Sequence, residues 1–318
     1  MNYLRDLTKE PYKGISTKGA KFIPTGFSLD DDINCLMGGK LTFITGQSEE
    51  GKSVVVHRIM LNAIEKGFKV LLVDGEHDQE ELIHKLYLKI IGNSKEHYTV
   101  KKFGRQYVKE PTDYAKQKLL KWINGNAFIF SKYLCDVNDL DQVYDLIEKH
   151  VKELGVDLVI LDNMMSLVTS TQSERNSAQA NFVKRTISMN RNNNCHSIIV
   201  NHPKKQEKGQ RGIEMDMFDM SGTSDMPNLA DNVLIVRRNF AKEDERRDYP
   251  KSKPEDLTKY NEPDGWIYLK KNRLNGRHAK VLLQYDHETQ NYNELIDGYA
   301  NVVEYNWNDN GLQGGLPF

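Results

Sequence analysis

Short apolar runs alternate with longer amphipathic stretches along most of this chain. The apolar runs are rich in Val, Ile and Leu, as buried parallel strands are. They predict strands at residues 41–45, 70–74, 127–131, 158–162, 197–201, 232–236, 266–270 and 281–285. Helical stretches such as 143–154 and 178–192 connect several of them. The pattern therefore predicts an α/β domain with a mostly parallel central sheet and helices on both faces.

Residues that favour turns and loops mark the limits of this domain. The last two predicted strands follow each other closely around Asn275-Gly276, which indicates a C-terminal antiparallel hairpin. Residues 203–217 and 241–265 are polar or densely charged and contain Gly or Pro, so we expect surface loops or insertions there. We expect an N-terminal arm or linker over residues 1–20, one domain over 21–298 and a flexible C-terminal tail over 299–318.

A phosphate-binding motif follows the first long apolar run. Gly46-Gln47-Ser48-Glu49-Glu50-Gly51-Lys52-Ser53 fits G-x-x-x-x-G-K-[ST] and is followed by a helical stretch that starts at Val54. Gly46 and Gly51 allow backbone N–H groups to surround phosphate oxygens, Lys52 can reach the β- and γ-phosphates, and the Ser53 hydroxyl can ligate Mg²⁺. The motif and Val54 are therefore predicted to bind ATP, or another triphosphate such as dTTP, together with Mg²⁺.

Two further predicted strands end in carboxylates. The run 158–162 ends in Asp162, in the form of a Walker B element that holds the water shell of Mg²⁺. The run 70–74 is followed by Gly75-Glu76, and Glu76 is our candidate for the base that orients or deprotonates the attacking water. The alternative is that Asp74, Glu76, His77 and Asp78 form a solvated turn without a catalytic role.

Composition excludes several other classes of protein. The 318 residues carry a net charge of −1, so binding of a polyanion requires a local basic patch. The three cysteines, Cys35, Cys135 and Cys195, form no C-x-x-C pair, which argues for a reducing compartment and against a zinc ribbon. No apolar stretch approaches the ~20 residues of a membrane span, and residues 1–10 lack a signal-peptide pattern. We expect a cytoplasmic protein, located in the host cytoplasm if a phage encodes it.

Several short motifs occur together in a specific order. They are Ile23-Pro24-Thr25-Gly26-Phe27, Asp74-Gly75-Glu76, Ile160-Leu161-Asp162-Asn163, Asn193-Asn194-Cys195-His196, Val200-Asn201-His202-Pro203-Lys204-Lys205, Ala230-Asp231-Asn232-Val233-Leu234-Ile235 and Lys271-Asn272-Arg273-Leu274-Asn275-Gly276. With the P-loop they resemble the RecA-like P-loop NTPase core of the ring-shaped superfamily 4 helicases, the DnaB-like family, and above all the Twinkle and phage T7 helicase-primase types. The resemblance spans residues 22–298.

The resemblance implies roles for residues outside the P-loop. Glu76 falls on the catalytic base and His202 on the γ-phosphate sensor. Arg273 falls on an arginine finger and Lys271 on its companion, both of which reach the nucleotide of a neighbouring subunit. Arg238 and Tyr285 fall on positions that stack on the nucleotide base, which suits a guanidinium and a phenol ring. Hydrolysis then requires a homo-oligomeric ring, which we expect to be a hexamer.

The resemblance also implies a site for single-stranded DNA. Lys204, Lys205, Lys208 and Arg211 fall on the loop that grips the strand in the central channel, where cations contact phosphates without reading bases. The alternative is that this charge run is a solvated face. Asp225 departs from the family, which has a basic residue in that region, so we expect DNA contact to depend more on the loop after His202.

We interpret the chain as an NTP-dependent replicative DNA helicase with DNA-stimulated hydrolysis, 5′–3′ translocation and no fused primase, encoded by a phage or a similar compact replicon. Priming is then expected from another polypeptide, and a primase, a polymerase or a single-strand-binding protein are expected partners. The tail residues Leu316-Pro317-Phe318 are a candidate contact with such a partner. Two alternatives remain. One is a RecA/RadA-type recombinase, which residues 74–78 also resemble, and the other is a non-motor regulatory or helicase-loading ATPase.

Overall fold

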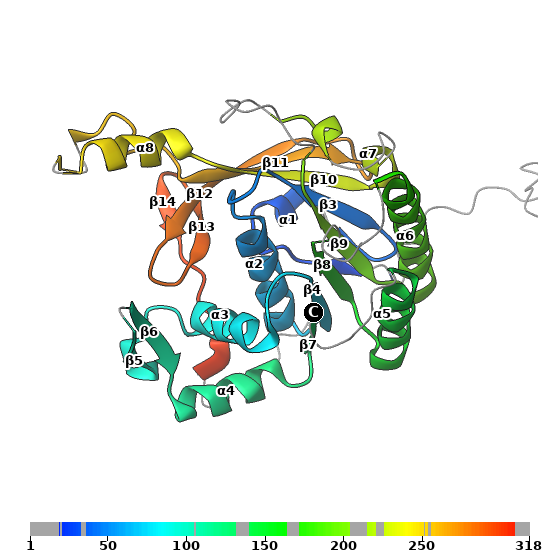
Figure 1. Ribbon diagram of the computed structural model, residues 1–318, viewed down its shortest axis with the longest axis horizontal. Helices are drawn as coiled ribbons and strands as arrows, with labels where there is room; N and C mark the ends of the chain where they lie inside the picture. Colours follow the sequence, from blue (N-terminus) through cyan, green and yellow to red (C-terminus); the bar gives the residue numbers. More distant parts are fainter. Residues whose placement is uncertain are drawn as a thin grey trace, which may run out of the picture.

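A ten-stranded sheet forms the centre of the molecule (Figure 1). The computed structural model describes residues 19, 21–32, 36–104, 106–131, 140–163, 172–203, 215–220, 226–250, 252–253 and 256–308. The strand order is β14-β13-β12-β11-β10-β3-β9-β8-β4-β7. The parallel part consists of β3 (Leu41–Thr45), β4 (Val70–Asp74), β7 (Ala127–Ser131), β8 (Leu158–Asp162), β9 (His196–Asn201) and β10 (Asn232–Arg238).

The antiparallel part continues the sheet beyond β10. It consists of β11 (Gly265–Asn272), β12 (Ala279–Asp286), β13 (Asn291–Ile296) and β14 (Tyr299–Asn301). The predicted C-terminal hairpin corresponds to β11 and β12, which pair antiparallel. A mostly parallel α/β sheet with a C-terminal antiparallel hairpin is therefore confirmed.

Helices cover both faces of the sheet (Figure 1). On one face lie α2 (Lys52–Glu65), α3 (Gln79–Ile91) and α4 (Asp113–Ile123), and on the other α5 (Leu140–Leu154) and α6 (Gln172–Asn193). Side chains alternate between the two faces along each strand. On β3, Ile44 packs into the cluster that contains α2, whereas Phe43 packs into the cluster that contains α5 and α6. Both faces are therefore dry, which explains the continuous apolar runs of the parallel strands.

Short elements complete the described fold. They are β1 (Phe22–Ile23), α1 (Leu29–Asp32), β2 (Leu36–Met37), η1 (Lys95–His97), η4 (Met217–Asp219) and α7 (Met226–Leu229). A separate hairpin of β5 (Tyr98–Phe103) and β6 (Gln106–Pro111) stands between α3 and α4 and was not predicted. Part of the charged segment 241–265, predicted as a loop or insertion, forms the helix α8 (Phe240–Asp248).

The packed domain extends beyond residue 298, the boundary that the sequence predicts. After β14, η6 (Asn306–Asn308) packs against α4. Tyr305 and Trp307 are 7% and 6% exposed, and Trp307 meets the ring of His97 edge-on with centroids 4.9 Å apart. These aromatic side chains anchor a segment whose composition is otherwise typical of a tail. Residues 309–318 and the arm, apart from Gly19, lie outside the described residues.

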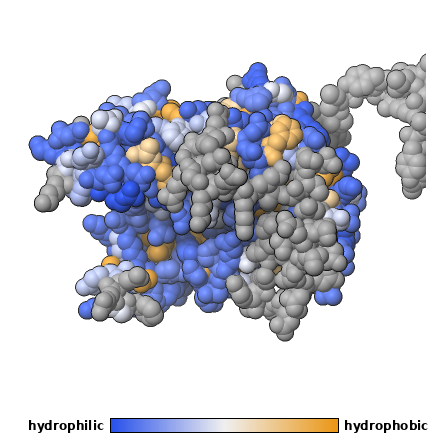
Figure 2. Space-filling view, turned by 45° about the horizontal axis from the view of Figure 1, so that its top comes forward, coloured by the Kyte–Doolittle hydropathy of each residue, from blue (hydrophilic) through white to orange (hydrophobic). Residues whose placement is uncertain are grey.

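The surface differs sharply from the core. The face in Figure 2 is mostly hydrophilic, with hydrophobic side chains in small separate groups. Among the described residues, no helix combines the length and the apolar character that a membrane crossing requires.

A buried histidine links β9 to two neighbouring segments at the amino end of the parallel strands. His196 has no exposed surface, its Nδ1 lies 2.8 Å from the Met37 carbonyl oxygen, and its Nε2 lies 2.9 Å from the Thr42 hydroxyl. The neutral imidazole satisfies both contacts if Nδ1–H donates to Met37 and Nε2 accepts from Thr42. Burial lowers the pKa of His196 from 6.5 to about 4.

We expect His196 to make the folded protein less stable as the pH is lowered. Between pH 6.5 and about 4 the unfolded chain binds a proton at this position and the folded chain does not, so acidification favours unfolding. The free energy of unfolding falls by roughly 3 kcal/mol as the pH is lowered across this window. Urea unfolding at several pH values measures the free energy of unfolding of wild type and of His196→Gln. This free energy should depend less steeply on pH in the variant. The exposed His278→Gln should behave as wild type, and equal slopes for all three proteins would contradict the assignment.

Candidate nucleotide site

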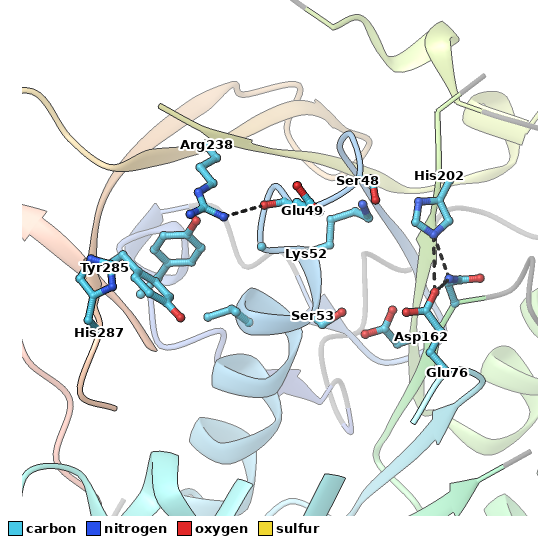
Figure 3. Close-up of a pocket in the computed structure, with 14 residues that line it drawn as sticks. Ser48, Glu49, Lys52, Ser53, Glu76, Asp162, His202, Arg238, Tyr285 and His287 are labelled. Atoms are coloured by element: carbon cyan, nitrogen blue, oxygen red, sulfur yellow. Dashed lines mark hydrogen bonds and ion pairs between the residues drawn. The ribbon is translucent and has the colours of Figure 1, made fainter. Parts of the chain in front are cut away.

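Strand register brings the candidate residues to one edge of the sheet. Asp74 pairs with Asp162 at the ends of β4 and β8, and Thr45 pairs with Asn201 at the ends of β3 and β9. The carboxyl ends of parallel strands are where open α/β sheets bind ligands. A cavity of about 530 Å³ lies there (Figure 3), lined by Ser48, Glu49, Gly51, Lys52, Ser53, Val54, Glu76, Asp162, Asn163, His202, Arg238, Tyr285, His287 and Tyr292.

The P-loop forms the floor of this cavity, and α2 begins directly at Lys52. Gly51 has φ +87°, and a Cβ atom there would lie 2.5 Å from the Tyr292 ring. Glycine is therefore required both by the backbone conformation and by the close approach of β13. The Lys52 ammonium donates to the carbonyl oxygens of Gly46 and Gln47, each at 2.8 Å. Burial lowers the pKa of Lys52, against the opposing effect of Asp162, Glu50 and Glu76.

Glu50, a predicted nucleotide contact, faces the interior of the loop and does not line the cavity. Its carboxylate accepts from the Gln47 backbone N–H at 2.6 Å and from Arg237 Nε at 3.1 Å, and the side chain is 1% exposed. Burial raises its pKa, although the Gln47 N–H and Arg237 oppose the shift. Glu50 therefore braces the loop against β10. Gly46 and Gln47 are likewise not lining residues, whereas the other predicted P-loop positions are.

Ser53 and Asp162 meet across the cavity floor (Figure 3). They are hydrogen-bonded to each other, and Asp162 is 6% exposed. Burial raises the pKa of Asp162 to about 6, and its Oδ2 has no hydrogen-bond partner among the described residues. A buried carboxylate with a free oxygen beside a hydroxyl is the hard oxygen donor set that Mg²⁺ prefers. The residues present therefore fit the predicted Mg²⁺ site.

Glu76 and His202 lie on one side of the P-loop (Figure 3), and Asn163 connects them. Its Nδ2 donates to Glu76 Oε1 and lies 2.9 Å from His202 Nε2. His202 Nε2 is itself 3.8 Å from Glu76 Oε1. Burial, followed by the charge of Lys52, lowers the pKa of His202. A neutral His202 with an unprotonated Nε2 accepts the second Asn163 hydrogen, so one amide orients both side chains. Asn163 was not predicted as a site residue, because its place after Asp162 in the sequence does not reveal its contacts with Glu76 and His202.

Aromatic side chains line the opposite side of the cavity (Figure 3). The Tyr285 ring meets His287 edge-on at 5.0 Å and Tyr292 at 5.3 Å. Arg238 donates to Glu243 and to the Glu49 carbonyl oxygen, the latter at 3.3 Å. This wall suits a planar heterocyclic base. Of its members the sequence predicted Arg238 and Tyr285. It missed His287, on the turn after β12, and Tyr292, on a strand that the pattern did not reveal.

Lys271 and Arg273 lie at the edge of the sheet opposite the cavity, near the amino ends of the parallel strands. Asn272 pairs with Asn232 at the amino end of β10, whereas Arg238 ends the same seven-residue strand at the cavity. At about 3.3 Å per residue, roughly 20 Å separates the two ends. Lys271 Nζ donates to the Pro227 carbonyl oxygen at 2.7 Å, and Arg273 donates to that of Asn228. The DNA-binding candidates Lys204, Lys205, Lys208 and Arg211 lie outside the described residues, as does Asp225.

Comparison with known proteins identifies the class of this domain. A profile of the AAA domain family matches residues 31–208, more than half of the chain, and the chain belongs to that family. A solved structure described as an ATPase domain matches with a TM-score of 0.62 and 16% identity, covering 85% of this chain and 90% of that chain. A DnaB-like replicative helicase, described with its interactions with primase, matches with a TM-score of 0.63 and 17% identity. No curated protein matches the chain.

The second structural match covers 85% of this chain but 62% of the helicase chain. The chain therefore spans less than two thirds of that relative. Both matches confirm the predicted fold, a RecA-like α/β core that this chain shares with an ATPase domain and with a DnaB-like replicative helicase. Family membership and the P-loop cavity together define a nucleotide-binding domain of the ATPase class.

We expect Glu50→Ala to destabilise the folded protein by about 3 kcal/mol, because it removes a buried carboxylate and with it the acceptor of the Gln47 backbone N–H and the ion pair with the half-buried Arg237. Glu49→Ala is the matched control, since Glu49 is the preceding residue of the same loop and its side chain is exposed. It should change the free energy of unfolding by less than about 0.5 kcal/mol. Urea denaturation measures both values. Similar losses for the two variants would show that Glu50 does not brace the loop.

Proposed function

We propose that this chain is the motor subunit of an NTP-dependent, ring-forming DNA helicase that moves 5′–3′ on single-stranded DNA and unwinds duplex DNA. The observation that carries the proposal is the division of its ATPase machinery. The P-loop, Asp162, Glu76 and His202 line the cavity, whereas Lys271 and Arg273 lie at the other edge of the sheet. Such a division suits a ring in which each subunit completes the site of its neighbour.

The residues around the cavity support hydrolysis of a triphosphate. Backbone N–H groups of the P-loop and the Lys52 ammonium bind the phosphates. Ser53 and Asp162 would hold Mg²⁺, which when bound neutralises charge on the β- and γ-phosphates. Glu76 orients the attacking water and takes its proton. Asn163 fixes Glu76 for that step, and Arg238, Tyr285, Tyr292 and His287 hold the base.

His202 connects the γ-phosphate end of the cavity with the proposed DNA loop. The Asn163 amide contacts both the His202 imidazole and Glu76, so a change in the contacts of Glu76 alters the hydrogen bond to His202. Pro203 pairs with Met220, which ties the chain on both sides of residues 204–214 to one point beside the sensor. In our proposal Lys204, Lys205, Lys208 and Arg211 contact phosphates of single-stranded DNA, and hydrolysis changes their grip through His202.

The replicative role is supported by the fold shared with a DnaB-like replicative helicase. On that basis we propose a hexamer acting in the cytoplasm with a primase, and with a polymerase or single-strand-binding protein that can be contacted by residues 316–318. A forked-duplex unwinding assay tests the proposal. Strand exchange by a filament would favour a RecA/RadA-type recombinase. Hydrolysis that single-stranded DNA does not stimulate would favour a regulatory or helicase-loading ATPase.

We expect Lys52→Ala and Glu76→Gln to fail at different steps. Loss of the P-loop cation should weaken triphosphate binding and lower hydrolysis by roughly 10²–10³-fold. Glu76→Gln should retain bound triphosphate while hydrolysis falls by about 10²–10⁴-fold, because only the base is removed. Nucleotide retention and phosphate release measure the two steps. Glu80→Gln, an exposed position on α3, should match wild type, and wild-type turnover by Glu76→Gln would exclude Glu76 as the base.

We expect Arg273→Ala to retain nucleotide binding while hydrolysis falls by about 10³-fold, because its guanidinium acts on the nucleotide of the next subunit. In mixtures with wild type, the variant should lower activity by more than its fraction. Arg277→Ala, another exposed arginine in the same segment, is the control and should dilute activity in proportion. Proportional loss with Arg273→Ala would indicate subunits that work independently.

A further inference from the structure

A second group of metal-ligating side chains lies beneath the P-loop. His57, Asp74 and Asp162 each place one possible ligand atom so that all three atoms lie within 4.8 Å of one another. The residues are 4%, 1% and 6% exposed. Of the three, only Asp162 lines the nucleotide cavity. The group therefore lies deeper in the protein than the phosphate-binding surface.

Secondary structure fixes this group from two directions. His57 is four residues after Ser53 on α2, so the two side chains share one face of the helix. Asp74 and Asp162 are direct neighbours across the β4–β8 register. The imidazole is thereby held over two carboxylates at the ends of adjacent buried strands.

Two atoms of this group lack the partners that buried polar atoms normally have. His57 Nε2 and Asp162 Oδ2 are buried and have no hydrogen-bond partner within the part of the chain that the structure describes. The buried His196 shows the usual solution in this fold, since both of its ring nitrogens are partnered. A buried imidazole nitrogen and a buried carboxylate oxygen without partners are each costly unless another species binds them.

Asp74 has acceptor capacity left for such a species. Its Oδ1 accepts from the backbone N–H groups of Glu76 and His77, at 2.8 and 2.7 Å, and its Oδ2 lies 3.0 Å from His77 Nδ1. Each carboxylate oxygen has two lone pairs, so Oδ2 can still act as a ligand. These hydrogen bonds also fix the orientation of the carboxylate, as outer contacts do in metal sites.

We propose that His57, Asp74 and Asp162 form a binding site for a divalent first-row transition-metal ion, such as Mn²⁺, that does not require bound nucleotide. One imidazole nitrogen and two carboxylate oxygens suit such an ion, whereas Mg²⁺ prefers oxygen ligands alone. The ion offsets two buried carboxylates and gives both unpaired atoms a partner. The site shares Asp162 with the proposed Mg²⁺–nucleotide site but does not depend on the proposed helicase function.

Mn²⁺ binding to the full chain without nucleotide tests this inference directly. Electron paramagnetic resonance measures free Mn²⁺ during titration, and wild type should bind one ion per chain at least tenfold more tightly than Mg²⁺ in competition. His57→Gln should weaken Mn²⁺ binding at least tenfold and abolish the preference over Mg²⁺. His196→Gln, a buried histidine whose ring is fully hydrogen-bonded, is the matched control and should bind Mn²⁺ as wild type does.

A spectroscopic measurement keeps the test decisive if His57→Gln fails to fold. Electron spin echo modulation of the wild-type Mn²⁺ complex should show a directly coordinated imidazole nitrogen, and His77→Gln should retain that signal. Absence of nitrogen coupling in wild type would overturn the site. So would the absence of nucleotide-independent Mn²⁺ binding, in which case the space between the three residues holds water only. Wild-type affinity in a folded His57→Gln would overturn it as well.

Discussion

The parallel pairing of β3, β9, β8 and β4 is the constraint on which the rest of the structure depends. It brings the ends of four strands to one level, so that Asp74 stands beside Asp162 and Thr45 beside Asn201. The turns that follow these ends carry the P-loop, Glu76, Asn163 and His202. Helices cover both faces of the sheet and exclude water from the strands whose register sets these positions. The pairing of the strands therefore fixes the relative positions of the residues at the site, although most of these residues lie on turns.

The antiparallel strands contribute a second support for the P-loop. Tyr292 on β13 packs so close to Gly51 that a side chain at that position would overlap its ring. The backbone of Tyr292 also accepts from Arg58, a buried residue of α2. On the other flank, Arg237 of β10 holds Glu50 inside the loop. The P-loop is thus held between two parts of the sheet that are far apart in sequence, and the same strands contribute Arg238 and Tyr292 to the aromatic side of the cavity.

Sequence reasoning predicted the parallel strands well because their burial on both faces leaves continuous apolar runs, and it placed Lys52, Ser53, Glu76, Asp162 and His202 around one cavity. It failed where a contact between distant segments decides the structure. The bridge of Asn163, the ring of Tyr292 and the inward orientation of Glu50 all depend on partners that no local pattern reveals. The packed segment around Trp307 has the composition of a tail and is held by two aromatic anchors. The β5–β6 hairpin carries exposed residues on both faces and lacks a strand period that can be recognised.

The strand β10 connects the two edges of the sheet to which the proposed function assigns separate roles. One end carries Arg238 at the cavity, and the other pairs with the segment that carries Lys271 and Arg273. Within one chain, roughly 20 Å of strand separates these two ends. On the proposed function, each subunit therefore uses one edge for its own nucleotide and the other for that of its neighbour. In such a ring, a shift of one subunit relative to the next would move Arg273 relative to the neighbouring nucleotide without deforming either sheet.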